Sequence, residues 1–557
     1  MIASVRALLP GRADVDLRPR VARADLLAGL TVGVVALPLA LAFGVSAGVG
    51  PAAGLVTAVV AGVVAAVFGG SHVQISGPTG AMAVVLAPLV AQHGAGAVPV
   101  VAVLAGVLVV LAGVARLGRV VTFVPWPVVE GFTLGIAAII ALQQVPAALG
   151  VTEPVGGNPL VTAVRAVGDS LGNGVTTLWT LAIVAAVAVV MLALPRVAPA
   201  VPASLVAVVL ATVVAQVADA PVARIGALPA SLPAPALPVL DAGTLRALIG
   251  PAVAVAALAA IESLLSARVA AAMPVPPLPG GGGDDDELRR YDPDRELVGQ
   301  GLASLASGVF GGMPATGAIA RTAVNVRAGA RTRASAVVHA LVILAVIAFA
   351  TGPVSAVPLA ALAGVLVVTA TRMVSLATVR AVLGSTRADA VVLVVTAVVT
   401  LAVDLVEAVQ IGLLVAAFFA LRSVAKATAV HREPLPGPAH EGDEHIALYR
   451  LDGAMFFGAA DRIRSEIRAD ADAYVVVLRL SHLRLVDATG AHALGELVAD
   501  LERSGVTVLV KGVQDRHRQL LTRVGVLDEL RHESHLFDDL DRALAHARSH
   551  VGRRVAA

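Results

Sequence analysis

The sequence predicts an all-α polytopic membrane domain followed by a C-terminal α/β domain, and three observations carry this prediction. Of its 557 residues, 57% are hydrophobic and only 14% are charged, values that lie outside the range of soluble globular proteins. Apolar runs of about 20 residues, enough to cross roughly 30 Å of hydrocarbon as a helix, recur between residues 26 and 421. After residue 430 charged residues become frequent and the apolar runs become too short for a span. We therefore expect a membrane domain over 25–426, a linker over 427–443 and a water-exposed domain over 444–557.

Fourteen apolar segments, separated by Gly, Pro and charged residues, are candidate spans. Most approach the length that a membrane-crossing helix needs. The third and the tenth are unusually short, and each begins at a stretch that contains Gly and Pro. The candidates are 26–47, 51–69, 78–92, 97–115, 125–148, 174–194, 201–218, 247–270, 297–311, 317–329, 334–352, 355–371, 388–405 and 408–424.

The distribution of basic residues predicts the orientation of these spans. Residues 1–24 are polar and lack a signal-peptide layout, so we expect them to form a cytoplasmic N-terminal segment. With that end inside, 20 Lys and Arg residues fall in segments on the inner side and 3 on the outer side, as the positive-inside rule requires. This favours an even number of crossings, with both termini in the cytoplasm of a bacterium and the chain in its inner (plasma) membrane. The net charge of +2 gives no reason to expect a nucleic-acid partner, and the absence of cysteine excludes disulfides.

The positions of the two short segments predict an internal repeat. They are the third of the first seven spans and the third of the second seven. Because seven is an odd number of crossings, the second repeat starts on the opposite side of the membrane and is inverted relative to the first. Short or Gly/Pro-interrupted segments at matching positions of two halves indicate a binding site near the bilayer midplane that is built from discontinuous helices. Two re-entrant or irregular loops are the alternative interpretation.

Both short segments predict a helix that starts inside the membrane. The first reads "QISGPTGAMA" (Gln74–Ala83), in which Pro78 is expected to begin the helix and extended chain to precede it. The second reads "GGMPATGAIARTAVN" (Gly311–Asn325) and has the same order of glycines, a proline, small residues and a helix. A helix start offers free N–H groups and a partial positive charge, which together suit an anion. Close helix packing through small residues is the alternative.

Two ionisable residues inside predicted spans indicate a functional site. Glu262 lies in the eighth span, with Ser266 one helical turn further on the same face. Arg321 lies in the tenth span and is the expected positive partner of Glu262. Because charged groups in hydrocarbon are costly, such residues are functional candidates. We expect Arg321 to add charge to the anion site and Glu262 to take up a proton or bind a cation, and a purely structural Glu–Arg pair is the alternative.

With these residues identified, the chain resembles the SulP-type anion transporters, the sulfate permease family that includes prestin and pendrin. The resemblance covers nearly the whole chain. It rests on "DLLAGLTVGVVALPLALAFGVSAGVGPAAGL" from Asp25, "QISGPTG" from Gln74, "AAIESLLSARVA" from Ala259, "RELVGQGLASLASGVFGGMPATGAIARTAVNVRAGARTR" from Arg295, and the tail. It implies fourteen spans as seven-plus-seven inverted repeats, a core domain that moves against a gate domain, a C-terminal STAS domain (sulfate transporter and anti-sigma-factor antagonist) and a homodimer.

The resemblance also implies which residues form the substrate site. The pocket of the family lies between the starts of the third and tenth helices, and the first and eighth spans complete it. The matching substrate-binding residues here are Leu39, Phe43, Thr79, Gly80, Gly317, Ala318, Ile319 and Arg321. By the same match Glu262 and Ser266 line the walls of this pocket, and we assign proton coupling to these two residues because Glu262 is a carboxyl group inside a span.

Departures from the family pattern bear on the substrate and the coupling ion. Leu39 stands where many sulfate-type members carry Gln, and this is closer to the bicarbonate-type members. The sodium-coupled bicarbonate members, however, carry Asp at the position of Glu262, carry Thr near Ile319 and lack the cation of Arg321. We therefore expect a proton-coupled symporter of a small anion, dicarboxylate or inorganic such as sulfate, without a cofactor or an enzymatic activity.

Three other functions stay open from the sequence. One is a sodium-coupled bicarbonate transporter, and another is an anion exchanger or channel of the same family. The third is a nucleobase permease with the same seven-plus-seven fold, against which Arg321 and the tail domain argue.

The tail predicts an α/β domain with a regulatory or assembly role. Strands are expected over Tyr474–Leu480 and Val506–Val510, with an amphipathic helix between them. The antagonist domains carry a phosphorylated Ser after the Asp of "VDATG", but here that residue is Ala488, which leaves Thr489 as a weaker acceptor. We expect Asp487 to cap the following helix instead. A metal site at Asp284, Asp285 and Asp286, in the Gly-rich loop 274–292, is a minor hypothesis.

Overall fold

The structure is a computed structural model, and the chain divides into two compact units, Met1–Leu413 and Leu414–Ala557. The three aspartates of the hypothetical loop metal site lie outside the described residues. The structure describes residues 18–119, 124–151, 158–170, 172, 174–198, 201–238, 241–274, 290–402, 405–427, 429–455 and 473–555.

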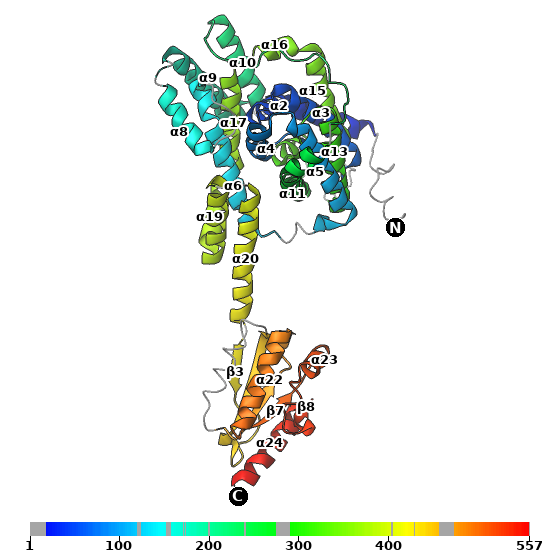
Figure 1. Ribbon diagram of the computed structural model, residues 1–557, viewed down its shortest axis with the longest axis vertical. Coiled ribbons are helices and arrows are strands. Elements are labelled where there is room, and N and C mark those ends of the chain that lie inside the picture. Colours follow the sequence, from blue (N-terminus) through cyan, green and yellow to red (C-terminus); the bar gives the residue numbers. More distant parts are fainter. Residues whose placement is uncertain are drawn as a thin grey trace. The chain divides into compact units, whose positions relative to one another are not determined.

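The first unit is a bundle of helices with one very short sheet (Figure 1). Its first half contains α2 (Pro19–Ser46), α3 (Pro51–Phe68), β1 (Ser76–Gly77), α4 (Gly80–His93), α5 (Ala97–Val114), α6 (Trp126–Gln143), α7 (Val145–Leu149), α8 (Pro159–Ser170), α9 (Gly174–Val197) and α10 (Ala203–Val217). Its second half contains α11 (Ala242–Ala272), α13 (Pro293–Val309), β2 (Thr316–Gly317), α14 (Ile319–Arg327), α15 (Ala334–Phe349), α16 (Thr351–Ser355), α17 (Leu359–Met373), α18 (Leu376–Ser385), α19 (Arg387–Ala402) and the start of α20 (Leu405–Ala427).

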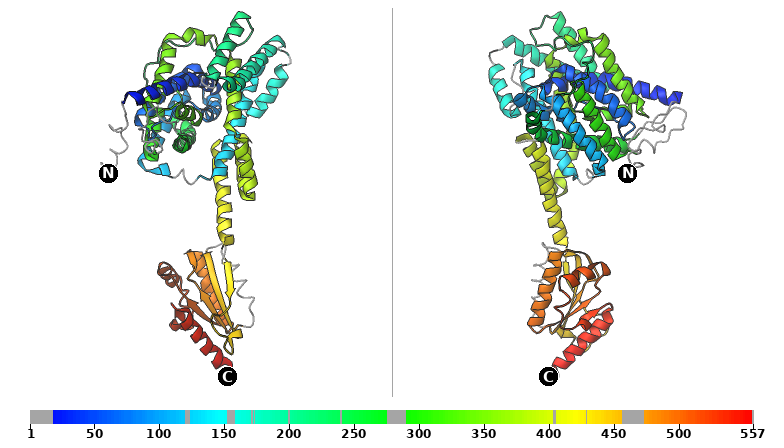
Figure 2. Two further views of the ribbon diagram at one scale, coloured as in Figure 1. Left: turned by 180° about the vertical axis from the view of Figure 1, so that it is seen from behind. Right: turned by 45° about the vertical axis from the view of Figure 1, so that its right-hand side comes forward.

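The helices of the first unit pack in two groups. In one group α13 packs on α3 and α5, and α15 packs on α2 and α3. In the other group α9 contacts α10 and α17, and α6 contacts α17 and α19. Figures 1 and 2 show these groups side by side from several directions. All fourteen apolar segments of the sequence coincide with helices, whereas the short helices α8 and α18 were not predicted.

The helices of the two short segments are shorter than a membrane crossing requires, although α10, with 15 residues, is hardly longer than α4. Seven helices in the described ranges, including α2, α5 and α11, are long and apolar enough to cross a membrane alone. At 1.5 Å per residue, the 14 residues of α4 reach about 21 Å and the 9 residues of α14 about 14 Å, both short of the roughly 30 Å hydrocarbon core. Neither helix can span the membrane by itself, which agrees with the discontinuous helices predicted from the sequence. The total of fourteen crossings stays a prediction.

The second unit contains a mixed six-stranded sheet. Its strands are β3 (Ala429–Glu433), β4 (Ile446–Met455), β5 (Val475–Arg479), β6 (Leu483–Val486), β7 (Thr507–Lys511) and β8 (Leu536–Phe537). Its helical elements are the rest of α20, η3 (Asp443–His445), α22 (Ala488–Arg503), α23 (Asp515–Arg523), η4 (Glu533–His535) and α24 (Leu540–Val555). The strand order is β3-β4-β5-β7-β8, with β6 paired to β4, and only the β3–β4 pair is antiparallel among the pairs described.

The two predicted strands and the helix between them are present as β5, β7 and α22. The amphipathic face of α22 buries Leu494, Leu497 and Val498 in the core of this unit. On the other side of the sheet Ala543, Leu544 and the following apolar residues of α24 pack against β4, β5 and β7. The sheet is therefore covered on both faces, as the apolar character of its parallel strands requires.

The predicted cap of α22 is confirmed. Asp487 has extended backbone and its Oδ1 accepts the N–H of Gly490 at 2.7 Å. Replacement of Asp487 by Ala is expected to destabilise the start of α22 by about 1 kcal/mol, the usual cost of losing an N-cap. Hydrogen exchange of the first turn of α22 in the full chain measures this effect. Replacement of Asp528 by Ala is the matched control because Asp528 is exposed and makes no side-chain hydrogen bond that the structure describes.

Candidate functional site

The two short helices meet through the chain segments that precede them. Ser76 pairs with Gly317 and Gly77 with Thr316 in the antiparallel β1–β2 ladder. The N–H of Ala318 continues this ladder by donating to the carbonyl of Ile75 at 2.8 Å. Extended chain before both helices was predicted, but its pairing was not. The ladder satisfies backbone groups that would otherwise be costly to bury at membrane depth.

The start of α4 corrects one detail of the prediction. The helix begins at Gly80, not at Pro78, because Thr79 is its N-cap and its Oγ1 accepts the N–H of Met82 at 3.5 Å. Pro78 lies one residue before the cap, and its carbonyl accepts a hydrogen bond from Arg321 instead of starting the helix ladder. The second helix begins at Ile319, after the extended residue Ala318.

A network of buried polar side chains holds this crossing. Gln300 on α13 donates to Ser76 Oγ at 2.6 Å and to Glu296 Oε1 at 2.8 Å. Glu296 in turn accepts the N–H groups of Gly70 and Ser71 at 2.8 and 3.0 Å. All of these side chains are nearly inaccessible to solvent. Since each bond joins segments more than 200 residues apart, except the one within α13, the network fixes the first half of the domain against the second.

Three further contacts support the second short helix. The Oγ of Ser263 on α11 accepts the N–H of Gly317 at 3.1 Å. Thr322 Oγ1 accepts the N–H of Ile75 at 3.0 Å and lies 3.3 Å from Ser266 Oγ. Ser266 is therefore buried behind β2 and supports the start of α14.

Glu262 lies at the point where α11 meets both short helices. Its Oε2 accepts hydrogen bonds from Thr79 Oγ1 and from Thr316 Oγ1, each at 2.9 Å. The two threonine oxygens are themselves 3.1 Å apart. The carboxyl group thus closes a triangle of three oxygens between α11, the cap of α4 and β2.

Arg321 lies beside the chain segment that precedes α4, next to Gly77 and the carbonyl of Pro78. It is 2% exposed, its Nη2 donates to the carbonyl of Pro78 at 2.6 Å, and its Nη1 has no hydrogen-bond partner among the residues that the structure describes. The described side chains of Glu262 and Arg321 form no ion pair with each other. The alternative of a structural Glu–Arg pair is not supported by a direct contact, because Glu262 is held by the two threonines and Arg321 by a backbone carbonyl. The two groups still interact electrostatically across the junction, as expected for Arg321 as the positive partner of Glu262.

The family of the chain follows from this architecture and from its sequence relatives. Residues 23–396 match the family model described as Sulfate permease family, and residues 438–543 match the STAS domain. The chain belongs to the sulfate permease family. This confirms the predicted fold class, a helical membrane domain with a C-terminal α/β STAS domain, and the chain is a multi-pass anion transporter.

Relatives in the sulfate permease family carry different substrate names. A Bacillus subtilis protein named "Putative sulfate transporter YvdB" is 35% identical over 93% of this chain and 96% of its own length. The bicarbonate transporter BicA of a Synechocystis strain is 32% identical over 95% of this chain and 94% of its own length.

Solved structures support the same fold. The transmembrane domain of a cyanobacterial BicA is 31% identical, with a TM-score of 0.60 over 72% of this chain and 98% of that chain. Murine Slc26a9, an anion transporter solved in the inward-facing state, superposes with a TM-score of 0.83 over 99% of this chain and 95% of that chain. Its 16% identity supports likeness of fold alone.

The structure brings most of the predicted site residues of this family member to one junction. A Cβ atom at Gly80 would lie 3.2 Å from the Phe43 ring and 2.4 Å from Ile140 Cδ1, so α2, α4 and α6 meet there. Leu39 is buried one turn before Phe43 on α2. The N–H of Ala318 is engaged in the hydrogen bond to Ile75 that continues the β ladder. Ile319 is the first residue of α14, and its side chain is 40% exposed.

Sequence reasoning missed Thr316, Gln74 and His339 at this junction. Thr316 is fully buried and bonds Glu262, and Gln74 Nε2 donates to the carbonyl of Ser263 at 3.3 Å. His339 on α15 is fully buried, and within the described ranges neither of its ring nitrogens has a hydrogen-bond partner. Thr316 and Gln74 stand inside the quoted motifs, but only the fold brings them to Glu262 and Ser263.

Gly77 is the residue whose replacement tests the Arg321 contact. Its φ of +153° favours glycine, and a Cβ atom there would lie 2.9 Å from Arg321 Nη1. Replacement of Gly77 by Ala is expected to displace the guanidinium and to reduce anion uptake, in addition to about 1–2 kcal/mol of backbone strain. Replacement of Gly94 by Ala is the matched control, because Gly94 has a φ of +79° and a Cβ there contacts nothing. Equal loss of uptake in the two variants at equal thermal stability would contradict the assignment.

Proposed function

We propose that the chain is a secondary active transporter that carries a small anion together with protons by alternating access. The anion would bind at the junction of α4 and α14. The observation that carries this proposal is Arg321, a buried cation near the start of α4 whose Nη1 has no hydrogen-bond partner in the described part of the chain. A buried donor without a partner costs about 1–3 kcal/mol, and an anionic ligand would remove this cost.

The helix starts add to the attraction for an anion. The first N–H groups of α4 and α14 have no acceptor within their own helices, and each helix carries partial positive charge at this end. Thr79 occupies one side of the proposed site and the guanidinium of Arg321 the other. A planar guanidinium with two donor edges suits an oxyanion such as a carboxylate or sulfate.

The oxygen triangle around Glu262 supports proton coupling. Its three oxygens make three contacts of 2.9–3.1 Å, but the hydroxyls of Thr79 and Thr316 supply only two protons. When Glu262 is ionised, both hydroxyls donate to it and the contact between the threonines is left without a proton. When Glu262 is protonated, each oxygen donates one hydrogen bond and accepts one, so the ring is closed. The protonated state is therefore well accommodated here, and loss of the proton would rearrange the cap of α4 at the anion site.

A sodium-coupled bicarbonate transporter is the second candidate. Two of the relatives are named bicarbonate transporters, and one of them matches over nearly the whole chain. Against it, the carboxyl group that would coordinate sodium is engaged by two hydroxyl donors.

An anion exchanger or channel is a further alternative that would use the same anion site. It would need the positive charge of Arg321, but it would not need Glu262 to take up and release a proton.

The remaining features of the transporter are proposals of the same kind. We propose a homodimer in the bacterial plasma membrane with both termini cytoplasmic, in line with the distribution of basic residues. We also propose that the STAS domain serves assembly or regulation and that no enzymatic step occurs.

A competition assay tests the substrate class. Uptake of a labelled anion into proteoliposomes is measured against unlabelled sulfate, bicarbonate, chloride, fumarate and succinate at two pH values, with and without sodium. We expect competition by a divalent oxyanion or a dicarboxylate, stronger at the lower external pH and independent of sodium. Competition by bicarbonate alone, and only with sodium, would favour the second candidate.

A further inference from the structure

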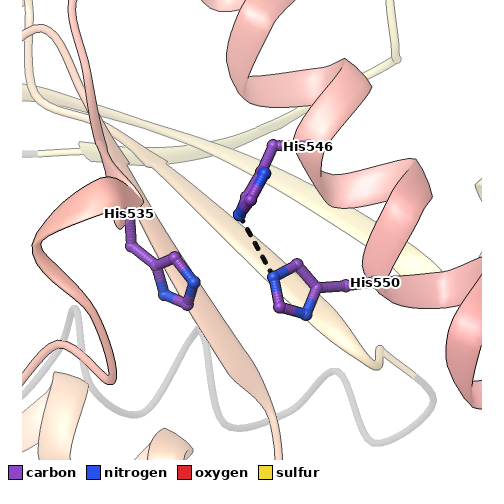
Figure 3. Close-up of side chains that lie close together, drawn as sticks. All are labelled: His535, His546 and His550. Atoms are coloured by element: carbon purple, nitrogen blue, oxygen red, sulfur yellow. Dashed lines mark hydrogen bonds between the residues drawn. The ribbon is translucent and has the colours of Figure 1, made fainter.

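The STAS domain contains a cluster of three histidines outside the transport site. His535 ends η4, just before the edge strand β8, and His546 and His550 lie one turn apart on α24 (Figure 3). One ring nitrogen from each of the three lies within 4.8 Å of the other two. Figure 3 shows the three rings turned toward one another.

The nitrogen positions are close to those of a metal site. Zinc binds imidazole nitrogen at about 2.0–2.1 Å in a tetrahedron, which places ligand nitrogens roughly 3.4 Å apart. His546 Nε2 and His550 Nε2 are already 3.2 Å apart. The largest separation in the cluster is within 4.8 Å, so small rotations of the rings would bring all three nitrogens to one ion.

His535 is the buried member of the cluster, with a side chain that is 1% exposed. His546 and His550 are half-buried, so solvent can reach the cluster from the side of α24.

The charge state of the cluster suits ligation. Burial and the neighbouring histidines lower the pKa of His535 to about 4, and burial together with Arg553 lowers the pKa of His550. Neutral imidazole is the form that binds metals. Arg531 and Arg553 add positive charge nearby, which keeps the imidazoles neutral but also weakens the attraction of the cluster for a dication.

We propose that His535, His546 and His550 form a binding site for a borderline transition-metal dication of the Zn²⁺ class. Three imidazoles select such ions over Mg²⁺ and Ca²⁺, which prefer oxygen ligands. One ion would link α24 to η4 and the β8 edge of the sheet. The site would thereby stabilise the C-terminal helix of the STAS domain.

Binding requires only a change of tautomer in the histidine pair. The 3.2 Å contact between His546 and His550 places a proton on one of the two Nε2 atoms. Zn²⁺ needs the lone pairs of both, so that proton moves to Nδ1 of the same ring, or is released to solvent where Nδ1 of that ring already carries a proton. No redox step is involved, and chelation reverses the binding.

The test uses the full-length protein in detergent, with no polyhistidine tag and after removal of metals. Titration with Zn²⁺ is expected to show one ion per chain and to raise the unfolding midpoint of the STAS domain. Co²⁺ is the spectroscopic probe, because a tetrahedral nitrogen site gives strong visible absorption. Replacement of His546 or His550 by Ala is expected to weaken Zn²⁺ binding at least tenfold, since even loss of an outer-shell partner costs 10–100-fold in metal affinity.

The matched control is His492→Ala on α22. His492 is exposed and lies one turn from Glu496, so it resembles the pair on α24 in spacing but not in burial or ligand set. This variant should bind Zn²⁺ as the wild type does. If the wild-type protein binds no stoichiometric Zn²⁺ and gives no tetrahedral Co²⁺ spectrum, the proposal is wrong, whatever the variants show. Binding that survives both α24 substitutions would also overturn it, as an adventitious ion only.

Discussion

Replacement of Glu262 by Gln is expected to abolish proton-driven accumulation of the anion. The amide keeps the size of the side chain and can hydrogen-bond Thr79 and Thr316, but it cannot take up or release a proton. Uptake into proteoliposomes with an inward proton gradient should fall to the level measured without a gradient. Exchange of labelled for unlabelled anion should continue, because the variant resembles the protonated state permanently.

The control for this prediction is Glu407→Gln. Glu407 lies exposed in the first turn of α20, and its replacement should leave the pH dependence unchanged. If Glu262→Gln retains gradient-driven uptake at the wild-type rate, the assignment of proton coupling to Glu262 is wrong. If both exchange and uptake disappear while the protein remains folded, Glu262 acts in anion binding instead.

Replacement of Arg321 by Ala is expected to cause the largest loss of anion affinity. Hydrogen bonds to charged groups contribute about 1.5–3 kcal/mol, which corresponds to roughly 10- to 150-fold in the apparent dissociation constant. Arg321→Lys should recover part of this loss because it keeps the positive charge. The recovery should be incomplete, because only the guanidinium group of Arg can donate to the Pro78 carbonyl with one nitrogen and offer the other nitrogen to the ligand. Binding of the labelled anion to the purified protein measures this effect independently of transport.

Arg327→Ala is the matched control for Arg321. Arg327 lies in the last turn of the same helix and is exposed. Its removal should change anion affinity less than threefold, whereas unchanged affinity in Arg321→Ala would exclude this guanidinium from the binding site. A loss in Arg321→Ala that Arg321→Lys does not relieve at all would indicate that the Pro78 contact, and not the charge, is what matters.

The sequence was sufficient to locate the junction of the two short helices. The Gly/Pro stretches before Gly80 and Ile319 interrupt apolar runs, and irregular backbone at membrane depth is tolerated only where it is buried in protein or lines a cavity. Glu262 and Arg321 are ionisable residues inside predicted spans, where a charge is costly. These signals are local, and each can be seen without knowledge of the fold. The exact helix start was mistaken because Pro78 and Thr79 are both good helix-start residues, and the tertiary contact of the Pro78 carbonyl with Arg321 decides between them.

The polar partners of the site could not be predicted in the same way. A Thr or Ser in an apolar helix often bonds only the carbonyl four residues earlier, and Thr57 does so with Ala53 at 2.7 Å. Yet Thr57 also accepts the N–H of Met313 at 2.8 Å, a contact across 256 residues that no local pattern reveals. Thr316 and Gln300 are of this kind, since their importance depends on which segment the fold places opposite them.

The histidine cluster shows the same division between local and tertiary information. His546 and His550 are four residues apart, so their meeting on one helix face follows from the sequence once α24 is recognised. His535 reaches them only because η4 and β8 return the chain to the side of α24.

The central claim is that anion movement is coupled to protons through the junction of α4, α11 and α14. The most direct test is sodium-free uptake of the anion selected by the competition assay, in proteoliposomes whose internal and external pH are recorded at the same time. An imposed inward proton gradient should drive accumulation of the anion above its external concentration, and an outward anion gradient should acidify the exterior. Anion accumulation that needs sodium, or anion flux that leaves both pH values unchanged, would contradict the account.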